Sequence, residues 1–187
     1  MSTSLILIII LVVAGLWVAG AFNLLVRSRN RTKEAWSDID VQLKRRYDLI
    51  PNLIKTVKGY AAHESQVLEN VIKARSAAMG LPAQAGAKEH AQAENMLSGA
   101  LKSLFALSEN YPQLRAVESF AKLQDELSDT ENKIQAARRF YNTNVMTLNT
   151  QVEQFPTNIV ANMFGFKKEE FFELNESVAR EPVAVKF

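Results

Sequence analysis

The chain has 187 residues and a formal net charge of +2, enough material for one domain with a sizeable core. It contains no cysteine, which excludes disulfides, thiol nucleophiles, iron–sulfur clusters and Cys-ligated zinc. The charge is uneven: residues 1–26 carry no charged side chain, residues 27–33 carry four basic ones, and the rest is nearly neutral. Since the body lacks a broad basic face, we expect no nucleic-acid partner.

The first element is an apolar run, Leu5–Phe22, of 18 apolar or small residues. About 20 such residues cross the hydrocarbon core of a bilayer, so residues 1–26 are predicted to be a transmembrane anchor. The alternative is a cleaved signal peptide, because Ala19-Gly20-Ala21 is similar to a cleavage site. Against it, residues 1–4 carry no basic side chain, and the apolar run is longer than usual for a signal.

A basic juxtamembrane segment, residues 27–33, follows the anchor. Its charged side chains are Arg27, Arg29, Arg31 and Lys33. Basic residues beside a span stay on the cytoplasmic side, which predicts an outer N-terminus and a cytoplasmic body. The same side chains can reach anionic head groups of the lipid bilayer. Two interpretations stay open here, a topology signal alone and a membrane-surface site.

Residues 34–174 are predicted to form a bundle of three long antiparallel helices and a short fourth, because apolar residues recur at helical spacing without strand-like alternation. The first helix is expected to end at Gly80-Leu81-Pro82, the second at Pro112, the third at Phe155-Pro156, and the fourth to cover Thr157–Phe164. The apolar stripe of the first helix comprises Trp36, Ile39, Leu43, Tyr47, Ile50, Ile54, Val57, Ala61, Leu68 and Val71. Residues 175–187 are predicted to be an extended tail, because Pro182 cannot continue a helix.

Pro51 lies within the first helix and has no N–H to give to the carbonyl of Tyr47, so a bend is predicted there. If that helix ran unbroken from the membrane to Ala78, it would be about 75 Å long at 1.5 Å per residue. The shorter second helix would then leave its membrane-proximal stem partly uncovered. The predicted self-association residues on this stem are Trp36, Ile39, Leu43 and Tyr47.

Large apolar residues gather late in the chain. They are Phe155, Ile159, Met163, Phe164, Phe166, Phe171 and Phe172. They could cap one end of the bundle, or form an interface for a protein partner or a lipid surface. An up-down-up bundle would put Pro156 far from the membrane, whereas a sharp fold-back at Pro51 would bring it near.

The chain offers little that could support catalysis. His63-Glu64 begins an H-E-x-x-H motif, but Val67 stands where the second histidine is needed. Neither His63 nor His90 has the glutamate three residues earlier that a di-iron site requires. We therefore predict no catalytic residue, metal ligand or cofactor, and no enzyme activity. The acids Asp125, Glu126, Asp129 and Glu131 could face Arg45 and Arg46 across the bundle as structural pairs.

Several long motifs follow in order along the chain. They are "EAWSDIDVQLKRRYDLIPNLIKTVKGYAAHE", "AENMLSGALKSLFALSENYPQL", "LQDELSDTENKIQAARRFYN" and "FPTNIVANMFGF", with "REP" near the end. Together they resemble the LemA family of bacterial membrane proteins over about residues 23–187. The resemblance implies a single-pass protein with a helical cytoplasmic body, without catalytic residues or a cofactor, and with relatives associated with membrane organisation.

These observations lead to one leading hypothesis and two alternatives. The leading hypothesis is a non-enzymatic, membrane-anchored helical scaffold that forms a homo-oligomer and organises membrane or recruits partners. The first alternative is a monomeric or small-oligomer adaptor that tethers a cytosolic protein, with "EPVAVKF" as the docking peptide. The remote alternative is a metal-dependent hydrolase.

Overall fold

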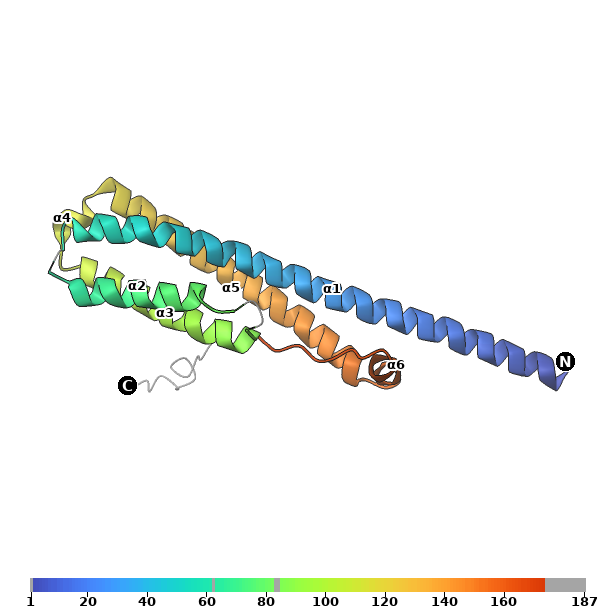
Figure 1. The fold of residues 1–187 in the computed structure, drawn as a ribbon. Helices are drawn as coiled ribbons and strands as arrows, with labels where there is room; N and C mark the ends of the chain where they lie inside the picture. Colours follow the sequence, from blue (N-terminus) through green and yellow to red (C-terminus); the bar gives the residue numbers. More distant parts are fainter. Residues whose placement is uncertain (1, 62, 83–84, 174–187) are drawn as a thin grey trace, which may run out of the picture. The chain divides into compact units, whose positions relative to one another are not determined.

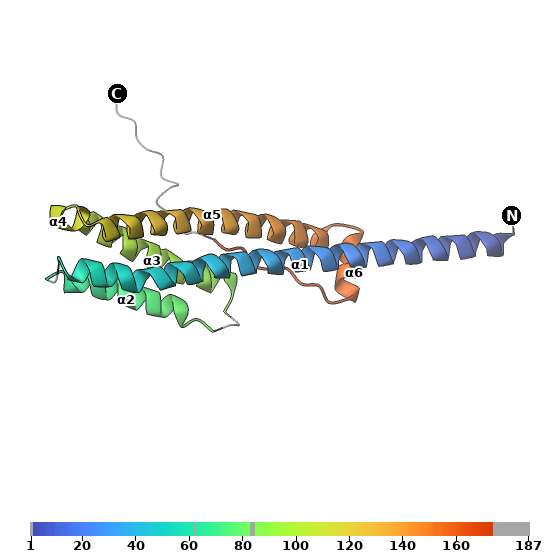
Figure 2. The same cartoon turned by 90° about the horizontal axis from the view of Figure 1, so that it is seen from above.

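A computed structural model of the chain describes residues 2–61, 63–82 and 85–173, so the predicted extended tail lies outside the described residues. Within the described ranges the regular structure is entirely α-helical, which confirms the predicted all-α class (Figures 1 and 2). The helices are α1 (Thr3–Lys58), α2 (Ser65–Met79), α3 (Ala87–Ser108), α4 (Pro112–Arg115), α5 (Glu118–Glu153) and α6 (Thr157–Met163).

The chain divides into two compact units. Among the described residues, the anchor unit contains residues 2–39 together with Ala137–Glu169, and the bundle unit contains Asp40–Ala136 together with residues 170–173. Both α1 and α5 contribute one part to each unit.

The prediction that the first helix reaches Ala78 is wrong, because α1 ends at Lys58 and α2 begins at Ser65. The break falls at Gly59, the residue with the lowest helix propensity in this stretch apart from Pro51. The amides of Gly59 and Tyr60 bond back three residues, to the carbonyls of Thr56 and Val57, which tightens the last turn of α1. The apolar stripe does not reveal the break, since Leu68 and Val71 of α2 enter the same core as Val57.

In the bundle unit, the later part of α1 packs with α2, α3 and the first part of α5. Figures 1 and 2 show α2 and α3 side by side, and the hydroxyl of Tyr111 after α3 donates to Glu64 before α2 at 2.9 Å, so these two helices are antiparallel. The buried core of the unit comprises Ile50, Leu53, Val57, Ala61, Leu68, Val71, Leu97, Leu101, Leu104, Leu114, Phe120 and Leu127. These residues come from every helix of the bundle unit, so a single core holds it together.

The buried face of α1 follows steps of three and four residues over most of its length. It comprises Ala21, Leu25, Ser28, Thr32, Ala35, Ile39, Leu43, Arg46, Ile50, Leu53 and Val57. Compared with the predicted stripe, Arg46 and Leu53 are fully buried, whereas Tyr47 and Ile54 are half-buried. This spacing is close to the 3.5-residue repeat of helices that pack lengthwise against others.

In the anchor unit, α5 runs antiparallel to α1. The rings of Trp36 and Tyr141 lie 5.3 Å apart, whereas Leu25 shares a core with Leu148. The chain then turns through α6 and leaves it at Gly165, whose φ of +70° is a left-handed conformation that glycine adopts without steric cost.

Of the two alternatives for the position of Pro156, the structure agrees with the one in which the chain folds back toward the apolar run, but the fold-back is not at Pro51. The break after Lys58 adds one long helix, so α5 returns toward the first part of α1 in the anchor unit. As a result α6 packs beside Ala21 and Leu25, directly at the end of the apolar run. The chain reverses at Gly59 rather than at Pro51, through which α1 continues as a helix.

Candidate functional site

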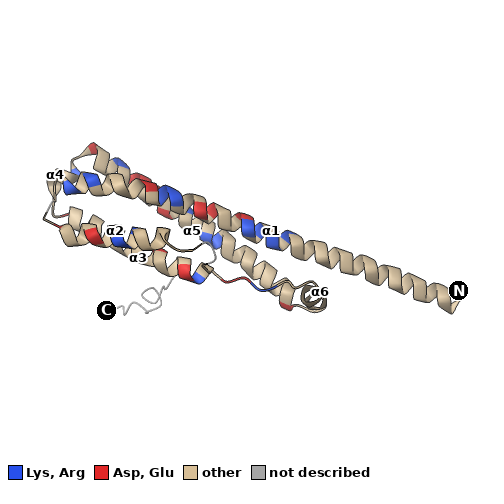
Figure 3. Ribbon diagram, in the orientation of Figure 1, with Lys and Arg blue, Asp and Glu red and all other residues tan. Residues whose placement is uncertain are grey.

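The first part of α1 is a candidate membrane span. It is long and apolar enough to cross a bilayer, and its most apolar stretch is almost entirely unburied. The exposed side chains include Leu7, Leu11 and Leu16, which are 61%, 72% and 69% exposed. Figure 3 shows that this part of α1 has no charged residue and that basic residues follow it. Exposed apolar residues around the whole helix are expected where lipid is the neighbour.

The four basic residues of the juxtamembrane segment are all exposed on α1. Between them Ser28 and Thr32 are buried, and the Thr32 hydroxyl donates to the carbonyl of Ser28 at 3.1 Å. Positions 27 and 31 therefore flank the buried face on one side, and positions 29 and 33 flank it on the other. The Arg29 guanidinium also lies 5.0 Å from the ring centre of Phe166, a cation–π distance.

The predicted C-terminal interface residues do not form one surface. Phe166 and Phe172 are buried, at 7% and 1% exposed, and Phe171 and Phe172 belong to the bundle unit. The anchor-unit members that remain exposed are Phe155, Ile159, Met163 and Phe164. The ring centres of Phe164 and Phe166 lie 4.8 Å and 5.8 Å from that of Phe22. The segment after α6 therefore contacts the end of the apolar run.

The predicted self-association residues lie inside the chain's own fold. Ile39 and Leu43 are 0% and 3% exposed, Trp36 stacks edge-on with Tyr141, and the hydroxyl of Tyr47 donates to Glu94. The expectation that the chain leaves this stem uncovered is therefore wrong. The reason is the added long helix, because it lets α5 run back along α1.

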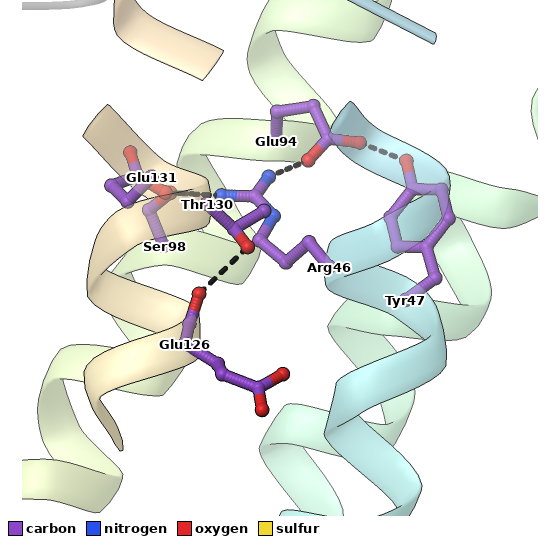
Figure 4. Close-up of polar contacts among 7 residues, drawn as sticks. All are labelled: Arg46, Tyr47, Glu94, Ser98, Glu126, Thr130 and Glu131. Atoms are coloured by element: carbon purple, nitrogen blue, oxygen red, sulfur yellow. Dashed lines mark hydrogen bonds and ion pairs between the residues drawn. The ribbon is translucent and has the colours of Figure 1, made fainter. Parts of the chain in front are cut away.

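A buried ion network lies in the bundle unit (Figure 4). Arg46 of α1 forms an ion pair with Glu94 of α3, and both side chains are only 1% exposed. Arg46 also donates to Glu131 of α5 at 2.6 Å and to the Ser98 hydroxyl at 3.0 Å. Three helices are thereby connected through one guanidinium group, while on the surface Arg45 pairs with Asp129 at 3.4 Å.

The environment of this network shifts two pKa values. Burial lowers the pKa of Arg46 from its ordinary value, and the carboxylate of Glu131 opposes this change. Burial raises the pKa of the Tyr47 hydroxyl, which the positive charge of Arg46 opposes. Tyr47 is therefore kept neutral, as a donor to Glu94.

The sequence anticipated part of this network. The predicted pairing of Asp129 and Glu131 with Arg45 and Arg46 is confirmed, whereas Asp125 and Glu126 have no ion pair with them in the structure. Glu94 was missed as a partner. The buried face of α3 runs from Ala87 to Ala91, four residues on, and from Ala91 to Glu94, three residues on. An acid on such a buried face is the signal that could have revealed this partner.

The buried ion network holds three helices together. His63 lies in the turn before α2, not on a helix, and Glu64 accepts a hydrogen bond from Tyr111. Among the residues that the structure describes, no cluster of three or more His, Asp and Glu side chains could hold a metal ion. The exposed apolar end of the anchor unit and its basic flank are both suited to a membrane surface.

An all-helical fold with one candidate membrane span that continues into a bundle defines a class of membrane-associated helical proteins. The LemA family profile matches residues 35–187, and the chain belongs to the LemA family. The resemblance of its motifs is thereby confirmed.

Relatives of the chain support this assignment. It is 26% identical over 175 residues to the magnetosome protein MamQ 1 of Paramagnetospirillum magneticum, covering 81% of this chain and 64% of the relative. It is 25% identical over 174 residues to the magnetosome protein MamQ of Magnetospirillum gryphiswaldense, with the same coverage. It is 27% identical over 158 residues to the protein LemA of Metamycoplasma hominis, covering 84% of this chain and 71% of the relative. The chain thus spans about two thirds of the length of these relatives.

Proposed function

We propose that the protein is a non-enzymatic scaffold of the bacterial cytoplasmic membrane, held by a single span, which self-associates and organises membrane or recruits partners. The observation that carries this proposal is that α1 is unbroken from Thr3 to Lys58. One helix therefore provides both the candidate span and part of the bundle core, and no loop separates them. Two of the relatives bear the name of magnetosome proteins, which fits a role at a membrane.

The proposed orientation has the N-terminus outside and the bundle in the cytoplasm. It is supported by the exposure of Arg27, Arg29, Arg31 and Lys33 directly after the apolar run, since basic residues are retained on the cytoplasmic side. The surface for self-association must differ from the stem residues, because Ile39 and Leu43 are occupied inside the chain.

The test is the native mass of the full-length protein in mild detergent and in lipid discs, measured by mass photometry and followed by electron microscopy. A discrete assembly of several copies that persists on dilution would support the scaffold. A monomer or dimer at every concentration would contradict self-association and leave the adaptor as the better description.

A further inference from the structure

The loop that carries α6, Gln154–Phe166 (hereafter the α6 loop), contains no charged residue. Four of its large apolar side chains are mostly exposed: Phe155 is 75% exposed, Ile159 52%, Met163 66% and Phe164 51%. Phe155, Ile159 and Met163 are spaced four residues apart. A water-exposed surface rarely gathers so many large apolar side chains on so short a segment, so a partner is expected to cover them.

Polar contacts hold both ends of the α6 loop. Lys168 pairs with Glu153 at 2.7 Å, and the side chain of Asn149 exchanges two hydrogen bonds with the backbone of Glu169, at 3.0 Å and 2.9 Å. The charges nearest to the loop in sequence therefore lie at its base, where contacts within the anchor unit tie its two ends together.

The other face of the α6 loop packs on α1 at the end of the apolar run. Val160, Ala161 and Phe166 share a buried core with Ala21 and Leu25. Val18, Phe22 and Val26 pack against the same core. The loop therefore lies alongside residues 18–26, immediately before the first basic residue, Arg27.

The length of the apolar run indicates whether residues 18–26, and the α6 loop packed on them, lie in water or in lipid. If the α6 loop were outside the bilayer, only residues 5–17 of the apolar run would remain to cross it, a length of about 20 Å at 1.5 Å per residue. The hydrocarbon core is about 30 Å thick, so that length is too short. Residues 5–26 give about 33 Å, which is sufficient. A span of sufficient length therefore places residues 18–26, and the loop packed against them, at the membrane.

We infer that the α6 loop inserts into the leaflet that faces the basic segment and that lipid covers Phe155, Ile159, Met163 and Phe164. The contact of Arg29 with Phe166 fits the same boundary, because it joins the basic segment to the base of the loop. Helices that lie in the head-group region bury an apolar face at the boundary with the acyl chains, and the exposed side chains of the α6 loop provide such a face. The inference rests on the membrane attachment within the proposed function and is independent of self-association.

The absence of cysteine allows a direct test. Nitroxide spin labels are attached to full-length Ile159→Cys and Met163→Cys variants in discs of phosphatidylethanolamine and phosphatidylglycerol. Their collisions with oxygen and with a water-soluble nickel chelate are compared. Thr143→Cys is the matched control, because Thr143 is exposed on α5 of the same unit near Tyr141, at the level of Trp36 rather than of the apolar run.

We expect the two α6 labels to collide with oxygen and to lose most of their contact with the nickel chelate, while the control label keeps both. An α6 label as accessible to the chelate as the control would overturn the inference. Protection that is lost in discs holding one copy would also overturn it, since a second copy of the chain would then be the covering partner. If the protein does not self-associate, protection of the α6 labels from the chelate in single-copy discs would still support the inference, while the proposed scaffold would be contradicted.

Discussion

At the scale of single residues, Arg46 is a charged side chain that lies in the core of the bundle unit. It occupies the buried face of α1 between Leu43 and Ile50 and meets Glu94 and Glu131 from two other helices. A buried ion pair adds little net stability, but removing one partner leaves an unpaired charge in the interior. Its value here is in fixing how α1, α3 and α5 align, because a shift of any of the three helices would separate the charges.

We predict that Arg46→Met lowers the free energy of unfolding by about 3–5 kcal/mol, because Glu94 is left charged and buried. Arg46→Met combined with Glu94→Leu should recover part of this loss, since no charge is then buried. Chemical denaturation of the full-length protein in mild detergent, followed by circular dichroism, measures both. The control is Arg45→Met, which should change the stability little, because its pair with Asp129 is exposed to solvent. A double variant less stable than Arg46→Met would contradict the prediction.

The sequence predicted the ion pairs of Arg45 with Asp129 and of Arg46 with Glu131, but not the fully buried pair of Arg46 with Glu94. Arg45, Arg46, Asp129 and Glu131 were recognisable as facing charges, because they lie on neighbouring helices of an antiparallel bundle. That Arg46 and Glu94 lie in the core was not recognisable from residue type, since charged residues are rarely fully buried. Only their place in the repeat of three- and four-residue steps indicates that they are buried. For α1 this indication was ambiguous, because Tyr47 fits the same repeat between Leu43 and Ile50 almost as well as Arg46 does.

At the scale of elements, Pro51 shows how a helix tolerates a residue that should interrupt it. Proline gives no N–H to the Tyr47 carbonyl, but the Arg75 Nε of α2 donates to that oxygen at 2.9 Å. The orphaned acceptor in α1 thereby becomes a tie between two helices of the bundle unit. The predicted bend at Pro51 stays a prediction, whereas the continuity of α1 is shown.

The two positions should therefore be coupled in stability. Arg75→Met should cost about 1 kcal/mol, the usual net contribution of a hydrogen bond. Pro51→Ala restores an amide to the carbonyl of Tyr47 and should stabilise the helix by up to about 3 kcal/mol. In the Pro51→Ala background, Arg75→Met should then cost much less. A double-mutant cycle by chemical denaturation measures the coupling, and equal costs in both backgrounds would show that Arg75 has a different role.

The ends of helices were predictable where a proline or a helix-capping glycine follows. The ends of α3, α5 and α6 fall within a few residues of Pro112, Pro156 and Gly165, as expected. The end of α1 was missed because its stop is a single glycine and the apolar stripe stays in phase across it. Because this one turn was missed, the direction of the later long helices was not predicted, and the position of α6 stayed open between two alternatives.

At the scale of the whole molecule, the proposed orientation leads to a further prediction. Since the chain has no cysteine, Ser2→Cys and Ser103→Cys each introduce a single thiol, and both serines are exposed. In spheroplasts a membrane-impermeant maleimide should label the Ser2→Cys variant, and the Ser103→Cys variant only after the membrane is opened. The basic segment is the physical cause, because it resists transfer to the outer side. The reverse labelling pattern would show an inverted protein.

The packing of α6 at one end of the span also has a consequence for membrane shape. In the proposed orientation, a single helix about 10 Å wide would cross the outer leaflet. Where the α6 loop lies among the head groups, the inner leaflet must accommodate that helix, the loop and the end of α5 in the same lateral space. Each copy then takes up more area on one side of the bilayer than on the other. Many copies crowded into a patch would expand the inner leaflet and favour a membrane that bulges toward the cytoplasm.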